Sequence, residues 1–212
     1  MTSGGVPEIW LAALDRSVAP RRITQSADTV SFAGSELIFR SLENTANFIT
    51  RVRKDGSEPR RVMETPVIGI GDVSPNGRWA ILFPSGTGES NTRGAALVVS
   101  LDTGTSRPLC AGCRVIWAPD GTWLYAALAP DAALAPAGGQ APMRALAVPL
   151  GATQEPPDSL DDMLNQAAKG TPRPGGRLVG IFPSVLGPGA DPSIYAFTKR
   201  DMQRNLYRIP LH

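Results

Sequence analysis

The residues best suited to chemistry in this chain are two cysteines and one histidine. Cys110 and Cys113 are separated by two residues, and the single histidine is His212. A Cys-x-x-Cys pair becomes reactive when a helix N-terminus lowers the pKa of its first thiol, and no helical pattern follows this pair. Three interpretations stay open: a disulfide that ties two strands together, two inert reduced thiols, or a redox site.

The remaining composition argues against other catalytic sites. A Ser-His-acid triad needs a histidine held between a nucleophile and a carboxylate, and we expect a terminal His212 not to be held. Two cysteines and one distant histidine cannot supply four ligands to a tetrahedral metal site. The segment 69–72, Gly-Ile-Gly-Asp, is neither a dinucleotide fingerprint nor a phosphate loop. We therefore predict no catalytic residue, no metal and no cofactor, and a protein that is not an enzyme.

An internal repeat predicts the elements that position these residues. The segment 72–82 returns 44 residues later in the segment 116–125. The equivalent turn residues are Pro75, Asn76, Gly77 and Trp79 in the first copy, and Pro119, Asp120, Gly121 and Trp123 in the second. Proline presets φ at the first turn corner, and glycine takes the positive φ that a side chain resists. Each copy therefore predicts two strands joined by a tight turn, and such a period indicates a repeat architecture.

The other half of each repeat is an apolar run that leads through a turn to a proline. Three runs begin near Ile9, Phe48 and Ala96. The outermost strand of a sheet tolerates a proline because its open edge needs no N–H donor. The two halves together predict an all-β fold, a β-propeller of four-stranded antiparallel blades, with about four to five blades in this chain.

We expect one propeller domain over residues 1–212. Its predicted parts are a partial blade at 8–23, blades at 27–63, 67–110 and 114–181, and a partial blade at 182–211; the blade 114–181 carries a helical insertion at 158–169. The two partial blades at the ends of the chain each include the third strand of a blade. If they combined into one closing blade, that blade would therefore have one strand too many. We therefore expect the C-terminal part of a larger ring; the alternative is a small closed ring with one terminal strand unpaired.

The helical insertion and the aromatic residues have predicted places. Four apolar side chains of the insertion fall on one helical face, which we expect to pack on the propeller's flank. They are Leu160, Met163, Leu164 and Ala167. Trp79 and Trp123 hold equivalent positions, and we expect them to wedge between neighbouring blades. The alternative places them on the rim as a carbohydrate-stacking surface.

The charge pattern indicates neither nucleic-acid nor membrane binding. The formal net charge is +2, and the basic residues Arg51, Arg53, Lys54, Arg60 and Arg61 have Asp55 and Glu58 among them. We expect them on the solvated edge of an outer strand. No stretch is apolar enough to span a bilayer, and the first residues do not resemble a secretory signal. A complete chain would therefore be cytoplasmic.

The repeated turns resemble those of the TolB family of propellers. The segments that carry the resemblance are 74–79, 118–125 and, more weakly, 192–197. The end of the chain, from Tyr195 to Leu211, also resembles the C-terminal sensor propeller of bacterial membrane-anchored serine/threonine kinases. This second resemblance implies a sensor part without its kinase and favours an extracytoplasmic, periplasmic location.

Three functions follow as hypotheses. The first is a non-catalytic interaction or sensor propeller that binds a protein or peptide. The second is an accessory domain of an upstream enzyme, a kinase or a peptidase. The third is a glycan or small-molecule binder. The fold does not choose among them, because propellers host all three.

Overall fold

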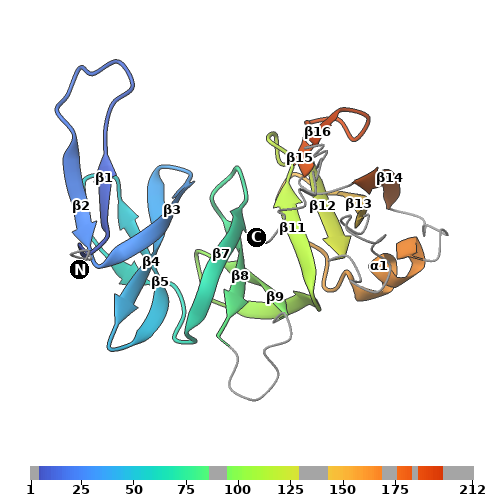
Figure 1. Ribbon diagram of the computed structural model, residues 1–212, viewed down its shortest axis with the longest axis horizontal. Helices are drawn as coiled ribbons and strands as arrows, with labels where there is room; N and C mark the ends of the chain where they lie inside the picture. The colour runs from blue at the N-terminus through green and yellow to red at the C-terminus, as the bar shows by residue number, and fades with distance from the viewer. Residues whose placement is uncertain (1–4, 86–94, 129–142, 169–175, 183–185, 198–212) are drawn as a thin grey trace, which may run out of the picture.

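The computed structural model describes residues 5–85, 95–128, 143–168, 176–182 and 186–197. In these residues five antiparallel sheets follow one another along the chain (Figure 1). The first is the N-terminal hairpin, β1 (Glu8–Leu11) with β2 (Arg21–Gln25). The last is the C-terminal hairpin, β15 (Leu186–Pro188) with β16 (Tyr195–Phe197).

Three four-stranded sheets lie between the two hairpins. The first sheet holds β3 (Ala27–Ala33), β4 (Glu36–Glu43), β5 (Ala46–Arg53) and β6 (Arg60–Arg61). The second sheet holds β7 (Val67–Val73), β8 (Trp79–Pro84), β9 (Ala96–Ser100) and β10 (Ser106–Cys110). The third sheet holds β11 (Cys113–Trp117), β12 (Trp123–Leu128), β13 (Met143–Pro149) and β14 (Arg177–Phe182). In each sheet the strands pair in chain order, as in a propeller blade.

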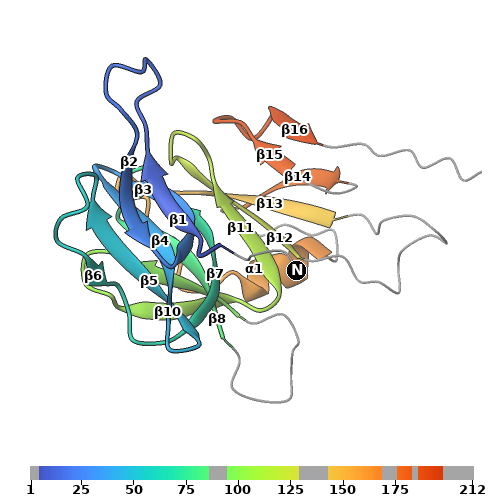
Figure 2. The same cartoon turned by 60° about the vertical axis from the view of Figure 1, so that its left-hand side comes forward.

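The sheets stand side by side with their faces packed together (Figures 1 and 2). Strand β8 shows why, because its side chains are apolar on both faces. Ala80 and Leu82 pack in the core cluster shared with the first sheet. Ile81 and Phe83 point the other way, into the cluster shared with the third sheet. A sheet that is apolar on both faces is stable only between two neighbours, and this arrangement confirms the predicted all-β class of four-stranded antiparallel blades.

One helix, α1 (Asp161–Ala168), lies in the segment between β13 and β14. It packs beside the third sheet, and its buried side chains join the core between the second and third sheets. These side chains are Leu164 and Ala167, with Met163 partly buried; Leu160, just before the helix, is buried in the same cluster. The predicted packing of the apolar helix face is therefore confirmed.

One of the sequence expectations is corrected. Arg51 was expected on a solvated edge and is instead buried between the first and second sheets. Its guanidinium forms ion pairs with Glu36 and Asp102 and donates a 2.8 Å hydrogen bond to the Leu101 carbonyl. Arg51 is buried because these acceptors come from both sheets and satisfy the charge there.

Other expectations fall outside the described residues, namely the end of the insertion at 169–170 and the last predicted strand at 205–211. Among the described residues, no helix has the length and hydropathy needed to cross a membrane.

Candidate functional site

The cysteine pair lies where the second sheet connects to the third. Cys110 ends β10, Cys113 begins β11, and the structure joins them in a disulfide with their Cα atoms 5.9 Å apart. Both side chains are buried in the core between the two sheets. Gly112 in the link has a φ of +65°, a conformation that costs glycine little. The pair therefore holds a tight, buried connection, and its redox state in the cell stays a prediction.

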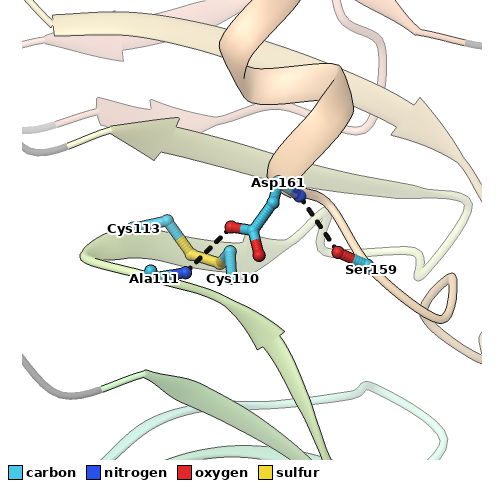
Figure 3. Close-up of a disulfide and its surroundings, with 5 residues drawn as sticks. All are labelled: Cys110, Ala111, Cys113, Ser159 and Asp161. Carbon is cyan, nitrogen blue, oxygen red and sulfur yellow. Dashed lines mark hydrogen bonds between the residues drawn. A yellow bond between two sulfur atoms is a disulfide. The ribbon is translucent and has the colours of Figure 1, made fainter.

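Helix α1 begins beside this disulfide (Figure 3). Asp161 Oδ1 accepts a 3.0 Å hydrogen bond from the Ala111 backbone N–H. Ser159 Oγ accepts a 3.2 Å bond from the Asp161 N–H. The sequence argument looked for a helix directly after the cysteines. The helix that lies beside them is instead the predicted insertion, whose Asp161 is 50 residues from Ala111 along the chain. The carboxylate of Asp161 adds negative charge at this helix N-terminus, which opposes the stabilisation of a thiolate.

The two repeated turns share one hydrogen-bond pattern. Gly77 N–H donates to the Ser74 carbonyl at 2.8 Å, and Gly121 N–H donates to the Ala118 carbonyl at 2.9 Å. The φ angles of these glycines are +70° and +75°. The prolines at the first corners, Pro75 and Pro119, are exposed. These residues form the turn; nothing in their geometry points to a ligand.

Asn76 and Asp120 complete the turns in the same way. Asn76 Oδ1 accepts from the Arg78 backbone N–H at 3.0 Å. Asp120 Oδ1 accepts from the Thr122 backbone N–H at 3.0 Å and from its hydroxyl at 2.8 Å. The bonds from Thr122 hold the pKa of the Asp120 carboxyl below its usual value. Asp120 is therefore a turn residue, as its place after the proline indicates.

Gln154 joins these two turns and was not singled out by the sequence. Its Oε1 accepts from the Asn76 backbone N–H at 3.0 Å, and its Nε2 donates to the Asp120 carbonyl at 3.3 Å. Its own carbonyl accepts from Trp117 Nε1 at 3.3 Å. A glutamine in a connecting loop carries no sequence signal for such a bridge, because its partners lie in two different sheets.

The repeated tryptophans take equivalent places on their sheets. Trp79 packs against the core between the second and third sheets. Trp123 packs on the opposite face of the third sheet, together with Tyr125. The Tyr125 hydroxyl donates a 3.2 Å bond to the Gly189 carbonyl of the C-terminal hairpin. Each indole thus faces the next sheet along the chain, which agrees with a wedge between blades.

Asp72 is a partly buried carboxylate that links the first strands of two sheets. Its Oδ2 accepts a 2.7 Å bond from the Trp117 backbone N–H. Burial raises the pKa of Asp72 above its usual value, although hydrogen bonds from the backbone of Trp117 and Val73 act in the opposite direction. Because the Asp72 carboxylate accepts a hydrogen bond from the backbone of the neighbouring sheet, we interpret it as a structural link between the two sheets. Among the described residues, no group of three or more His, Cys, Asp or Glu could hold a metal ion.

A groove lies between the N-terminal hairpin and the first sheet. Its polar end, about 570 Å³, is lined by Arg21, Ser35, Glu36, Arg53, Lys54 and Asp55. Its apolar end, about 460 Å³, is lined by Leu11, Ala12, Ala13, Val18, Ala19 and Phe32 together with Arg21 and Lys54. The two ends adjoin because they share Arg21 and Lys54. The groove therefore offers charge and apolar surface side by side.

The charged residues of the groove differ in whether they have a polar partner. Arg53 pairs with Glu58 at 2.7 Å, and Arg21 donates to the Lys54 carbonyl. Asp55 accepts bonds from the Ser57 hydroxyl and backbone N–H, which lower its pKa. The Lys54 ammonium lies 5.4 Å from the centre of the Phe32 ring. In the described part of the chain no carboxylate pairs with Lys54, so this ammonium can meet an acidic ligand.

Comparisons with known proteins concern the fold. No protein-family model and no curated protein matches the chain. Among solved structures it is similar to TolB from Acinetobacter baumannii, with 15% identity and a TM-score of 0.49 over 68% of this chain and 35% of that chain. It is also similar to a TolB structure from Agrobacterium tumefaciens, with 18% identity and a TM-score of 0.44 over 67% of this chain and 51% of that one. A nidogen/laminin complex gives 13% identity and a TM-score of 0.47 over 84% of this chain and 59% of that chain.

The chain thus spans about a third to a half of the length of the two TolB chains. TolB structures are among those that the chain is similar to, as its turn motifs predict. The resemblance to the sensor propeller of kinases stays a prediction. At these TM-scores the similarities give no argument about function, and the description of the fold rests on the sheet topology itself.

Proposed function

We propose that this chain is a non-catalytic β-propeller module that binds a protein or peptide partner in the groove. One observation carries the proposal: the cationic side chains of Arg21 and Lys54 border an apolar wall that the protein leaves open to solvent. Val18 and Phe32 in that wall are 65% and 59% exposed. Exposed apolar surface of this kind, rimmed by polar groups, marks interaction sites.

The partner's chemistry follows from the two ends of the groove. An apolar side chain fits against Val18 and Phe32, and a carboxylate fits beside Lys54. An extended acidic peptide with apolar residues supplies both groups at neighbouring positions. The charges fix its orientation, while burial of the apolar side chains supplies most of the affinity. No feature of the described residues favours the enzyme-accessory or glycan-binding alternatives.

The test uses a fluorescein-labelled octapeptide of alternating Glu and Leu, with a second peptide in which Lys replaces Glu. We expect fluorescence anisotropy to show binding of the acidic peptide only. Lys54→Glu and Val18→Asp should each raise its Kd about tenfold or more. Arg114→Glu, which changes an exposed basic residue on the third sheet, is the matched control and should leave the Kd unchanged. Equal binding of both peptides, or equal loss in the control, would contradict the proposal.

A further inference from the structure

The link between the second and third sheets is held by α1 as well as by the disulfide (Figure 3). The Ala111 N–H, between the two cysteines, donates to Asp161 Oδ1 at 3.0 Å. On the other side of Cys110, the Leu109 carbonyl accepts a 2.8 Å bond from the Leu160 N–H. The backbone on both sides of Cys110 is therefore bonded to the residues at which α1 begins. A change in the shape of the link changes how the helix is seated.

The two sulfur atoms lie inside a packed core. Cys110 and Cys113 are 1% and 4% exposed, in the apolar cluster that also contains Leu164 and Ala167 of α1. A covalent bond holds two sulfur atoms closer together than van der Waals contact allows two thiols to lie. Breaking the bond therefore enlarges the pair inside a close-packed core, and a neighbouring element must move.

Helix α1 is the neighbour that can move. The strands that carry the cysteines, β10 and β11, are held by backbone ladders to β9 and β12. The helix joins no ladder, and a helix of eight residues depends on its packing because it is unstable alone. The contacts described above attach it to the link: two hydrogen bonds and the apolar side chains that enter the core.

We propose that the Cys110–Cys113 disulfide is a redox switch, which a dithiol reductant opens and which then releases α1 from the sheets. A thiolate of the reductant attacks one cysteine sulfur, forms a mixed disulfide and expels the other cysteine as a thiolate. The second thiol of the reductant then displaces the first cysteine. The protein gains two electrons and two protons as a pair of thiols, and the reductant ends as an internal disulfide.

The docked helix in turn protects the disulfide. The apolar side chains of α1 help to bury both sulfur atoms, so the reductant reaches them only when the helix opens. The Asp161 carboxylate places a negative charge at the backbone N–H next to Cys110, which disfavours the thiolate that must leave. Release of the helix makes reduction more favourable, and reduction makes release more favourable by the same factor, because the two equilibria are linked.

The first test measures the rate of reduction. The oxidised protein is mixed with dithiothreitol, samples are quenched with an excess of a maleimide, and mass spectrometry counts the labelled cysteines. Leu164→Ala, which weakens the packing of α1, should speed reduction at least about tenfold. Leu82→Ala makes the same truncation in the core between the first and second sheets and is the matched control. It should change the rate by less than about twofold, because the opening is local.

A second pair of variants isolates the charge at the start of α1. Asp161→Asn keeps an oxygen acceptor for the Ala111 N–H and removes the negative charge, so reduction should be about two- to fivefold faster. Asp162→Asn removes the other acidic charge of the same first turn and is the control. It should have the smaller effect, because Asp161 is the residue bonded to the link. Equal acceleration by the two variants would contradict the proposal.

The third test asks whether reduction releases the helix. Hydrogen exchange is followed by mass spectrometry on the oxidised protein and on the protein reduced with dithiothreitol. Amides of residues 161–168 should exchange at least about tenfold faster after reduction, while those of 36–53 in the first sheet should not change. In a variant with Cys110→Ala and Cys113→Ala, dithiothreitol should leave every exchange rate unchanged, which controls for the reagent itself.

Three further results would overturn the proposal. The first is equal exchange of residues 161–168 before and after reduction. The second is equal acceleration of reduction by Leu164→Ala and Leu82→Ala, which indicates global unfolding. The third is a protein purified in air whose two cysteines are labelled without dithiothreitol. None of these measurements uses the groove, so this proposal and the proposed function fail separately.

Discussion

At the scale of single residues, Asp72 shows how one side chain couples two sheets at a cost. Its carboxylate accepts the Trp117 N–H, which would otherwise lie buried without a partner. The same burial disfavours the ionised carboxyl and raises its pKa. Substitutions at Asp72 can separate the effect of the hydrogen bond to Trp117 from the cost of burying the charged carboxylate.

Asp72→Asn keeps an oxygen acceptor and removes the charge, so we expect little loss of stability at neutral pH. Because the folded pKa is raised, the carboxyl contributes its full stability below the usual aspartate value of 3.8 and loses it as the pH rises through the raised value. Relative to Asp72→Asn, the unsubstituted protein should thus be most stable in acid. Asp72→Ala should cost about 1–3 kcal/mol because the Trp117 N–H is orphaned. Urea unfolding across pH measures all three proteins.

Asp120→Asn is the control for this pH dependence. Hydrogen bonds from Thr122 lower the pKa of Asp120, so its contribution is present above the usual value and is lost as the pH falls. The difference between Asp120 and its asparagine variant should therefore change with pH in the opposite direction. The same direction for both pairs would refute the assigned shift of Asp72.

The turn glycines differ in what surrounds them. Gly34 and Gly77 both have positive φ, at +61° and +70°. A Cβ added at Gly34 would lie 3.6 Å from the Asn76 carbonyl oxygen, an ordinary contact. A Cβ added at Gly77 would come within 2.4 Å of the backbone of Ala33 and Gly34. Gly77 is therefore required both by its own conformation and by the neighbouring turn.

Gly34→Ala should cost about 1 kcal/mol, because only the positive φ is strained. Gly77→Ala should cost at least about 2 kcal/mol more, since backbone must move to relieve the overlap. Chemical denaturation of the two variants gives both numbers. Similar losses at the two positions would show that the turns of the first and second sheets do not touch.

At the scale of elements, helix α1 completes a core that the strands leave open. Leu160 and Leu164 are buried between the second and third sheets, and the Leu160 N–H donates to the Leu109 carbonyl at 2.8 Å. Asp161 then caps the link that holds the disulfide. An insertion within one sheet thus stabilises the contact of that sheet with another.

Leu164→Ala should lower the free energy of unfolding by about 2–5 kcal/mol because it opens a cavity in a packed core. Asn165→Ala, on the exposed side of the same helix, should change it by less than about 0.5 kcal/mol. Urea denaturation of both variants tests the difference. If neither substitution changes the free energy of unfolding, the helix does not pack against the sheets in solution.

At the scale of the whole molecule, stability comes from contacts between successive sheets. Apolar clusters fill the spaces between the sheets, and the Arg51 network adds a polar link between the first and second. Repeats of this kind cannot bury their faces alone.

Local patterns in the sequence determined much of this fold. The Pro-Asn-Gly and Pro-Asp-Gly turns indicate tight hairpins because φ at proline and glycine depends on the residue itself. Alternating or continuous apolar runs indicate strands, and the spacing of Leu160, Leu164 and Ala167 indicates a helix face. These signals depend on a few neighbouring residues, so they can be recognised in the sequence without knowledge of the fold.

The tertiary structure alone decided which distant groups meet. Gln154 bridges two turns, Asp72 bonds Trp117, Arg51 is buried, and α1 begins beside the cysteine pair. The groove likewise needs the N-terminal hairpin to pack on the first sheet before Val18 and Lys54 become neighbours. Such contacts depend on how sheets stack, and stacking is set by the sum of many side-chain contacts that no short segment of sequence contains.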